Sequence, residues 1–126
     1  MGINDRIFFY DTYALYYITN GEENYKKYTK NHRIITSMMN LYELYYNLIK
    51  ENDEMLGEFY FKKLEGYCVK IDAEDIKMAA KFRKENIKKK LSYIDCLGYI
   101  IAKSNGVKFL TGDKEFDGLE NVEFVK

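Results

Sequence analysis

Five short apolar runs alternate along the chain with longer stretches in which apolar residues recur at helical spacing. The runs cover residues 7–10, 34–37, 67–71, 107–111 and 122–125. Continuous apolar runs of this length are typical of strands that are covered on both faces. Because parallel neighbours need long crossovers, the alternation predicts an α/β fold of three layers, with a mainly parallel central sheet flanked by helices.

The stretches between the runs carry the periodicity and the boundary residues of helices. Helices are expected from Thr12 to Asn20-Gly21, over residues 41–49 and 55–64, through residues 80–82, and from Ser92 to Ser104. Ser92 and Asp95 have the spacing of a capping box. Asn40 is the expected cap of the helix that follows the second run.

The composition suits one globular domain over residues 1–126. Hydrophobic residues make up 47% of the chain, and 20 basic residues balance 20 acidic ones. This balance excludes a uniformly basic surface that binds nucleic acid, but it permits a local basic patch. No apolar run reaches the roughly 20 residues of a membrane helix. We therefore expect a protein without a membrane segment, located in the cytoplasm.

Histidine and cysteine are too scarce for many hydrolytic and redox sites. His32 is the only histidine, so mechanisms that need two histidines are excluded. Cys68 and Cys96 are isolated, without the spacing of a zinc site or the number needed for a disulfide framework. Any hydrolytic chemistry must therefore use carboxylates, lysines, tyrosines or the two thiols.

Acidic residues stand where predicted strands end or where the following helices begin. Asp11 follows the first run and Asp113 follows the fourth, whereas Glu43 and Asp95 lie in the first turns of helices. Sites in parallel α/β folds form at the carboxyl ends of the strands, so these four carboxylates are expected to converge. A divalent cation would relieve their mutual repulsion, and carboxylate oxygens suit Mg²⁺ or Mn²⁺. The combination points to phosphodiester chemistry.

Each acid taken alone also has a simpler interpretation. Asp11 and Asp113 have the position of helix N-caps, Asp95 belongs to a capping box, and Asp117-Gly118 has the composition of a turn. Helix starts attract acids for reasons unrelated to catalysis. Both interpretations stay open for the single residues.

Taken together, four segments resemble the successive motifs of the PIN domain family. They are Ile7 to Leu15 with Asp11-Thr12 after an apolar strand, Asn40 to Leu44 with Glu43, Leu91 to Asp95 before an apolar helix, and Thr111 to Phe116 with Asp113. Their order and intervals are similar over nearly the full length. The resemblance implies a metal-dependent endoribonuclease that hydrolyses RNA. The small size resembles that of VapC-type toxins from toxin–antitoxin pairs.

The resemblance also implies roles for individual residues. The implied catalytic acids are Asp11, Glu43, Asp95 and Asp113. Asp11, Asp95 and Asp113 would bind Mg²⁺ or Mn²⁺, and Asp117 matches a position that adds a further acid in some members. Glu43 would act through the metal or its bound water.

Two hydroxyl residues match positions that orient the acids. Thr12 and Thr111 would bond to the metal ligands and fix their direction. Tyr13 departs from the family pattern, which usually has a small polar residue two places after the first aspartate. A hydrogen bond near the metal is therefore not expected at that position.

A basic run precedes the Asp95 motif. The residues expected to guide the RNA backbone are Lys84, Lys88, Lys89 and Lys90. A solvated helix end explains the same run equally well. The tyrosines within residues 13–17 and 42–46 are expected mainly to pack, and the remainder to stack bases or contact another chain.

The resemblance to VapC-type proteins implies a homodimer and a cognate antitoxin bound across a helical groove. A second hypothesis is a PIN-like module that binds RNA or a protein without cutting. The presence of all four acids argues against it. A third hypothesis is an RNA-processing nuclease that has no antitoxin.

Overall fold

The computed structural model describes residues 6–126, which form a central sheet with helices on both sides. The strands are β1 (Ile7–Tyr10), β2 (Arg33–Ile35), β3 (Lys108–Thr111) and β4 (Val122–Phe124). The α-helices are α1 (Thr12–Thr19), α2 (Met38–Lys50), α3 (Glu54–Glu65), α4 (Ala73–Glu85) and α5 (Tyr93–Ser104). Two short 3₁₀ helices are η2 (Glu23–Thr29) and η3 (Lys114–Phe116). No helix in this part of the chain is long and apolar enough to cross a bilayer.

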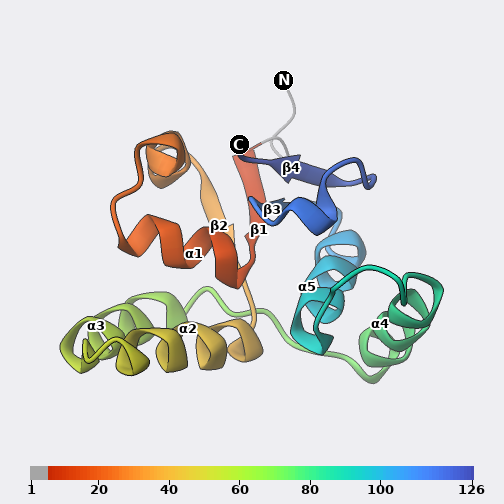
Figure 1. Ribbon diagram of the computed structural model, residues 1–126, viewed down its shortest axis with the longest axis horizontal. Coiled ribbons are helices and arrows are strands. Elements are labelled where there is room, and N and C mark those ends of the chain that lie inside the picture. The colour runs from red at the N-terminus through yellow and green to blue at the C-terminus, as the bar shows by residue number, and fades with distance from the viewer. Residues whose placement is uncertain (1–5) are drawn as a thin grey trace.

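The sheet has four strands in the order β2-β1-β3-β4, and every pair is parallel. Phe9 of β1 lies opposite Phe109 of β3, and Tyr10 lies opposite Leu110. Helices α1, α2 and α3 lie on one side of the sheet, and α4 and α5 lie on the other (Figure 1). The predicted three-layer α/β fold is therefore confirmed.

The two central strands divide the apolar interior into two cores, because successive side chains of a strand point to opposite faces. Phe8, Tyr10 and Leu110 pack with α1, α2 and α3. Phe9 and Phe109 pack with α4 and α5, and their rings stack with centroids 5.8 Å apart. Burial on both faces explains why these strands are continuous apolar runs.

The third predicted strand, over residues 67–71, is wrong. Among residues 6–126 it forms a single bridge, between Cys68 and Thr36, made by hydrogen bonds from Thr36 N to Tyr67 O (3.1 Å) and from Val69 N to Thr36 O (2.9 Å). The chain at Ser37 turns into α2 directly after Thr36, so the edge of β2 offers no further backbone partners. The β-favouring residues thus lack a neighbour with which to form a ladder.

The predicted cap of α2 is also wrong. Ser37 caps the helix and accepts a hydrogen bond from Asn40 N (3.3 Å), whereas Asn40 lies inside the first turn and is buried. The Ser37 hydroxyl donates to Asn40 Oδ1 (2.5 Å), and Asn40 Nδ2 donates to Thr12 Oγ1 (3.2 Å). Asn40 therefore ties the start of α2 to the start of α1.

Close packing of α5 on the sheet depends on Gly98. A Cβ atom there would lie 2.9 Å from Phe9 Cε1 and 3.2 Å from Phe109 Cε1. We expect Gly98→Ala to destabilise the fold by about 1–3 kcal/mol through overpacking, partly offset by about 1 kcal/mol of helix propensity. Urea unfolding followed by circular dichroism measures the difference.

Gly66→Ala is the matched control. Gly66 ends α3 with φ of −70°, and a Cβ atom there meets nothing within 4 Å. The control is expected to unfold at or slightly above the wild-type midpoint, because alanine lowers the entropy of the unfolded chain. Equal midpoints for the two variants would contradict the packing argument.

Candidate active site

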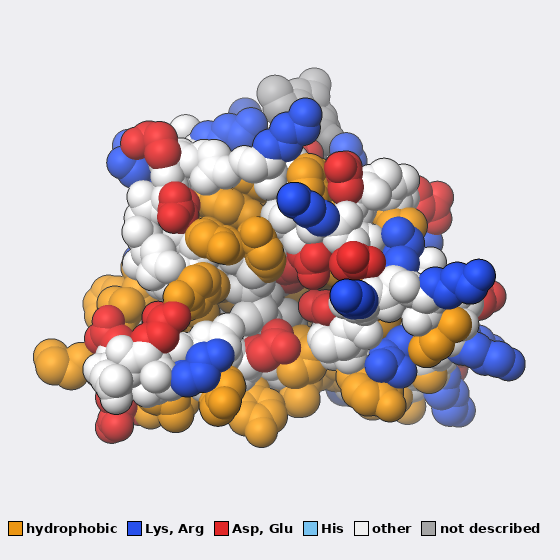
Figure 2. Space-filling model, viewed as in Figure 1, with side chains coloured by type: hydrophobic (Ala, Val, Ile, Leu, Met, Phe, Trp, Pro, Cys, Tyr) orange, Lys and Arg blue, Asp and Glu red, His pale blue; other side chains and the backbone are white. Residues whose placement is uncertain are grey.

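The carboxyl ends of β1 and β3 bring two of the predicted acids to one edge of the sheet. Asp11 directly follows β1, and Asp113 follows β3 after Gly112. The two strands are hydrogen-bonded neighbours, and Asp11 N continues the ladder by donating to Leu110 O (3.2 Å). This edge lies between α1 and α5 (Figure 1). Acidic side chains border the hollow at the centre of the face in Figure 2.

Asp11 is a buried carboxylate, with only 2% of its surface exposed. It caps α1, and its Oδ1 accepts a hydrogen bond from Ala14 N (2.7 Å). Burial raises the pKa of Asp11 well above its ordinary value, against the opposing hydrogen bonds from Thr111 and Ala14. The charges of Asp95 and Asp113 raise this pKa further. The fold thus stabilises the protonated form of Asp11.

Asp95 is half-buried at the start of α5. It forms the predicted capping box, in which Ser92 N donates to Asp95 Oδ2 (2.8 Å) and Asp95 N donates to Ser92 Oγ (3.0 Å). Burial raises the pKa of Asp95, and the negative charges of Glu43 and Asp113 act in the same direction. Helix α2 therefore presents Glu43 close enough for its charge to act on Asp95.

Asp113 caps η3 through a hydrogen bond from Glu115 N to its Oδ1 (3.0 Å). Its own amide donates to Thr111 Oγ1 (3.0 Å), so Thr111 bonds to both Asp11 and Asp113. Asp117 lies at the other end of η3, where its side chain is exposed. Its charge is not among those that shift the pKa of Asp11 or Asp95. The charges of Glu43, Asp95 and Asp113 thus act on Asp11 or Asp95, whereas the exposed Asp117 lies at the C-terminal end of η3.

Capping and metal binding do not compete for the same oxygen atoms in two of these residues. Asp95 accepts its backbone hydrogen bond through Oδ2, and Asp113 accepts its bond through Oδ1. The second oxygen of each carboxylate accepts none of the hydrogen bonds found in residues 6–126. The simple capping interpretation is correct for these acids, and it leaves an oxygen on each that can bind a cation.

The charge and chemistry of the four acids fit a hard divalent cation, but their side chains lie too far apart to enclose one. Carboxylate oxygens suit Mg²⁺ or Mn²⁺, which keep several water ligands in such sites. Within residues 6–126, the ion pairs between side chains involve Glu23, Asp72 and Glu120, and none neutralises the four acids. In the same residues, no three Asp, Glu, His or Cys side chains are close enough together to hold a metal ion. An ion would have to draw the carboxylates closer or bind partly through water.

Asn40 has a role near the acids that the sequence did not reveal. Thr12 is buried and accepts a hydrogen bond from Asn40, which was expected only to cap α2. The spacing of Ser37 and Asn40 was the available signal, because serine followed three residues later by a polar side chain is typical of a helix start.

The segment between α4 and α5 brings basic residues to η3. Lys89 Nζ donates to Glu115 O (3.2 Å), and Lys90 N donates to Glu115 Oε1 (3.1 Å). Lys84 and Lys88 are exposed, on the last turn of α4 and in the segment that follows it. The basic run is therefore anchored beside the element that Asp113 caps.

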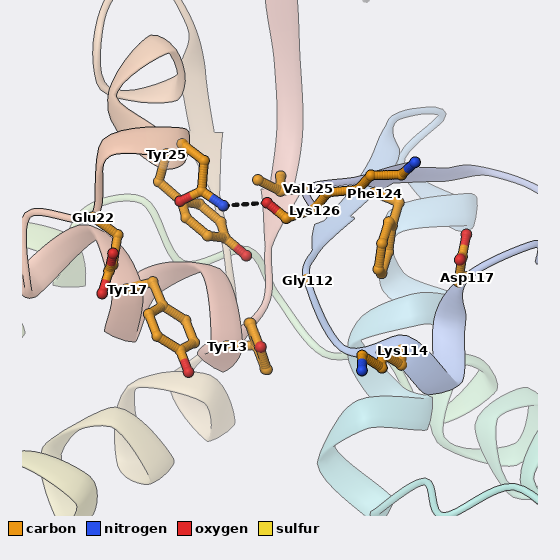
Figure 3. A pocket seen from close by; sticks show the side chains of 11 residues that line it. Tyr13, Tyr17, Glu22, Tyr25, Gly112, Lys114, Asp117, Phe124, Val125 and Lys126 are labelled. Carbon is orange, nitrogen blue, oxygen red and sulfur yellow. Dashed lines mark hydrogen bonds between the residues drawn. The ribbon is translucent and has the colours of Figure 1, made fainter.

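A pocket of about 530 Å³ lies beside the acidic edge, between α1 and η2 on one wall and η3 and β4 on the other (Figure 3). Its lining includes Tyr13, Tyr17, Tyr25, Gly112, Lys114 and Phe124, and we call it the tyrosine pocket. The tyrosines of α1 were expected mainly to pack, and Tyr25 and Gly112 were not singled out from the sequence. The closeness of this pocket to Asp11 and Asp113 follows from the fold alone.

The raised pKa of Asp11 predicts how the stability of the metal-free protein depends on pH. The folded state binds the Asp11 proton more tightly than the unfolded chain, so stability is lost as the pH rises from about 4 through the folded pKa. Asp11→Asn keeps a capping side chain but removes the buried charge. We therefore expect Asp11→Asn to raise the unfolding free energy of the metal-free protein at pH 7.

Thermal and urea unfolding in EDTA at pH 7 and pH 4 measure this effect. The gain should vanish at pH 4, where wild-type Asp11 is already protonated. Asp53→Asn is the matched control, because Asp53 caps α3 through a bond from Leu56 N (3.2 Å) but is exposed. A similar gain in both variants would show that burial of the charge is not the cause.

Comparison with known proteins agrees with this architecture. The PIN domain family matches residues 8–122. A toxin–antitoxin complex from Klebsiella pneumoniae has a TM-score of 0.74 at 18% identity, covering 92% of this chain and 95% of that chain. The toxin VapC20 of Mycobacterium tuberculosis, described as cleaving the sarcin-ricin loop, has a TM-score of 0.79 at 16% identity, covering 95% and 99%.

A third structure, VapBC2 from Rickettsia felis bound to a DNA fragment from its promoter, has a TM-score of 0.70 at 22% identity and covers 94% of this chain and 96% of that chain. The comparison with curated proteins gives no match. At these identities the solved structures establish a shared fold. The family match covers most of the sequence and includes the positions of all four acids. The chain belongs to the PIN domain family.

Proposed function

We propose that this protein is a divalent-metal-dependent endoribonuclease and the toxin of a toxin–antitoxin pair. One observation carries the proposal. Asp11, Glu43, Asp95 and Asp113 come from four different parts of the chain and have no cationic partner in the described residues, and the negative charges among them raise the pKa of Asp11 and of Asp95. Such an arrangement opposes folding unless a cation or a proton compensates it.

Three of the acids would hold the cation. Asp11 is fixed by Ala14 and Thr111, Asp95 by its capping box, and Asp113 by the amide of Glu115. When bound, Mg²⁺ or Mn²⁺ polarises the scissile phosphate and lowers the pKa of a water molecule. Glu43, on α2, would accept a hydrogen bond from the attacking water and hold it in line. Thr12 and Thr111 would act by fixing the start of α1 and the two acids at the sheet edge.

The substrate proposal rests on the shared fold and on the basic run. Lys84 and Lys88 are free to contact a phosphate backbone, whereas Lys89 and Lys90 also bond to Glu115. Hydrolysis by an outside water needs no 2′-hydroxyl, so the chemistry by itself does not select RNA over DNA. The description of the similar VapC20 as a toxin that cleaves the sarcin-ricin loop supports RNA.

The partner proposal follows the same comparison. Two of the similar structures are described as toxin–antitoxin assemblies, and this supports an antitoxin as partner. We also propose that the protein forms a homodimer and acts in the cytoplasm, as expected for VapC-type toxins.

One observation favours a second candidate function, a PIN-like module that binds RNA or protein without cutting. No three potential metal ligands in residues 6–126 are close enough to enclose an ion. A binding module would need no closed metal site. Metal binding therefore separates the two candidates more directly than a screen of RNA substrates, because a nuclease with a narrow substrate is inactive on most of them.

Mn²⁺ is expected to bind the wild-type protein and raise its melting temperature. Asp95→Asn should weaken that effect and lower the rate of RNA cleavage by at least about 100-fold, because a ligand and its charge are lost. Thermal shift against Mn²⁺ concentration, anomalous diffraction from a soaked crystal, and analysis of cleavage products for 5′-phosphate and 3′-hydroxyl ends are the measurements.

Asp53→Asn serves as the control for loss of an exposed acid at a helix start. Asp117→Asn tests whether the exposed acid of η3 belongs to the ligand set, and unchanged Mn²⁺ affinity would remove it. Wild-type cleavage by Asp95→Asn, or an Mn²⁺ peak away from these acids, would refute the assignment of the site.

A further inference from the structure

We propose that the tyrosine pocket binds the nucleobase of the nucleotide next to the phosphodiester that is cut. The base would stack on Tyr13 and form a hydrogen bond with the hydroxyl of Tyr25. The position of this nucleotide beside the cleaved bond rests on the proposed nuclease function. The affinity of the pocket for a base does not depend on that function.

The position of the pocket is the first argument. Gly112 lines it and stands between Thr111 and Asp113, whereas Tyr13 lines it two residues after Asp11. A nucleotide whose phosphate lies at the acidic edge therefore has its base within reach of this pocket. The volume of about 530 Å³ lies within the range typical of small-molecule pockets.

The walls of the pocket are the second argument. The Tyr13 and Tyr17 rings lie with centroids 4.7 Å apart, and the Tyr17 and Tyr25 rings stack with centroids 5.9 Å apart. Phe124 stands across the pocket from this series (Figure 3). Tyr13 is 39% exposed, so part of its ring remains uncovered. Every base has a face that can stack on such a ring.

An unpaired hydroxyl is the third argument. Tyr25 is only 2% exposed, and its Oη has no hydrogen-bond partner among the described residues. Burial raises the pKa of Tyr25, so the group stays a neutral hydroxyl that can both donate and accept. A buried polar atom without a partner destabilises the free protein. A ligand that supplies the missing partner removes that cost on binding.

Gly112 keeps the floor of the pocket open. A Cβ atom at this position would lie 2.3 Å from Tyr25 Oη and 2.7 Å from Tyr13 Cε1, so the hydroxyl, the Tyr13 ring and the Gly112 backbone meet at one point. Tyr13 is partly exposed, so its ring can change rotamer beside the hydroxyl without disturbing the core. We infer that Tyr13 swings aside to stack on the base as the base reaches Tyr25.

The charged groups that line the pocket suit a polar nucleotide better than an apolar side chain of a protein. Lys114, which directly follows Asp113, and Lys126 line the pocket, together with the acids Glu22 and Asp117. Neither lysine takes part in the ion pairs found in residues 6–126. An ammonium group at the rim and a hydroxyl on the floor match a phosphate and a base edge at the two ends of one ligand.

Binding of nucleoside 5′-monophosphates to the wild-type protein in EDTA tests the proposal without metal and without cleavage. The probes are adenosine and uridine 5′-monophosphates, with ribose 5-phosphate as the ligand that lacks a base. In ¹H–¹⁵N spectra, both nucleotides should shift the amides of Tyr13, Tyr25 and Gly112, and ribose 5-phosphate should bind much more weakly. Tyr13→Leu should weaken nucleotide binding roughly fivefold to a hundredfold through loss of stacking.

Tyr25→Phe removes only the unpaired hydroxyl. It is expected to raise the melting temperature, because an unpaired buried group is lost, and to weaken nucleotide binding about tenfold. Tyr28→Phe is the matched control from the same 3₁₀ helix, since Tyr28 is also buried but its hydroxyl donates to Glu123 (2.6 Å). The control should lower the melting temperature and leave nucleotide affinity unchanged.

Nucleotides that bind no better than ribose 5-phosphate would overturn the proposal and leave a protein side chain as the occupant of the pocket. The same effect of Tyr25→Phe and Tyr28→Phe on affinity would also overturn it. The metal titration is independent of these measurements. Base binding without Mn²⁺ binding would support the base-binding pocket and refute the proposed metal-dependent catalysis. Mn²⁺ binding without base binding would support the metal site and refute the base-binding pocket.

Discussion

Parallel pairing of β1 with β3 is the interaction on which the rest of the structure depends. The pairing sets Phe9 opposite Phe109 on one face and Tyr10 opposite Leu110 on the other, so both apolar cores are built on the same two strands. It also makes both strands end at one edge of the sheet. The acids of that edge therefore gain their proximity from backbone hydrogen bonds and apolar burial, which together outweigh the repulsion between the carboxylates.

The negative charge at this edge is held in place by helix starts. Asp11, Asp95 and Asp113 each accept a backbone hydrogen bond at the beginning of a helical element, where the amide groups favour an anion. Capping thus lowers the cost of burying the acids without cancelling it, because the pKa values of Asp11 and Asp95 remain raised. The remaining unfavourable charge favours a proton or a cation at this edge of the sheet.

The sequence predicted best those features that depend on one segment at a time. The runs that end at Asp11 and near Asp113 are strands because they are buried on both faces, and burial leaves a continuous apolar pattern. The segment at residues 67–71 has the same local preference but no partner edge, which depends on where β2 ends. The sequence predicted Asn40 as the cap of α2 and missed its contact with Thr12, because these two residues are 28 positions apart in the chain. Pockets and the distances between the acids depend on how several helices and strands pack together, so a local sequence pattern does not predict them.

The position after the first aspartate shows how one departure from the family pattern can change a site. Tyr13 lines the tyrosine pocket, and its ring and the Tyr25 hydroxyl both lie close to Gly112. A ligand that stacks on this ring and also pairs with the hydroxyl would bind better than one that offers only one of the two contacts. The same short loop, Thr111 to Asp113, fixes the acids on one side and shapes the pocket floor on the other. Changes in base preference within this fold would then arise at Tyr13 and Tyr25, without altering the acids.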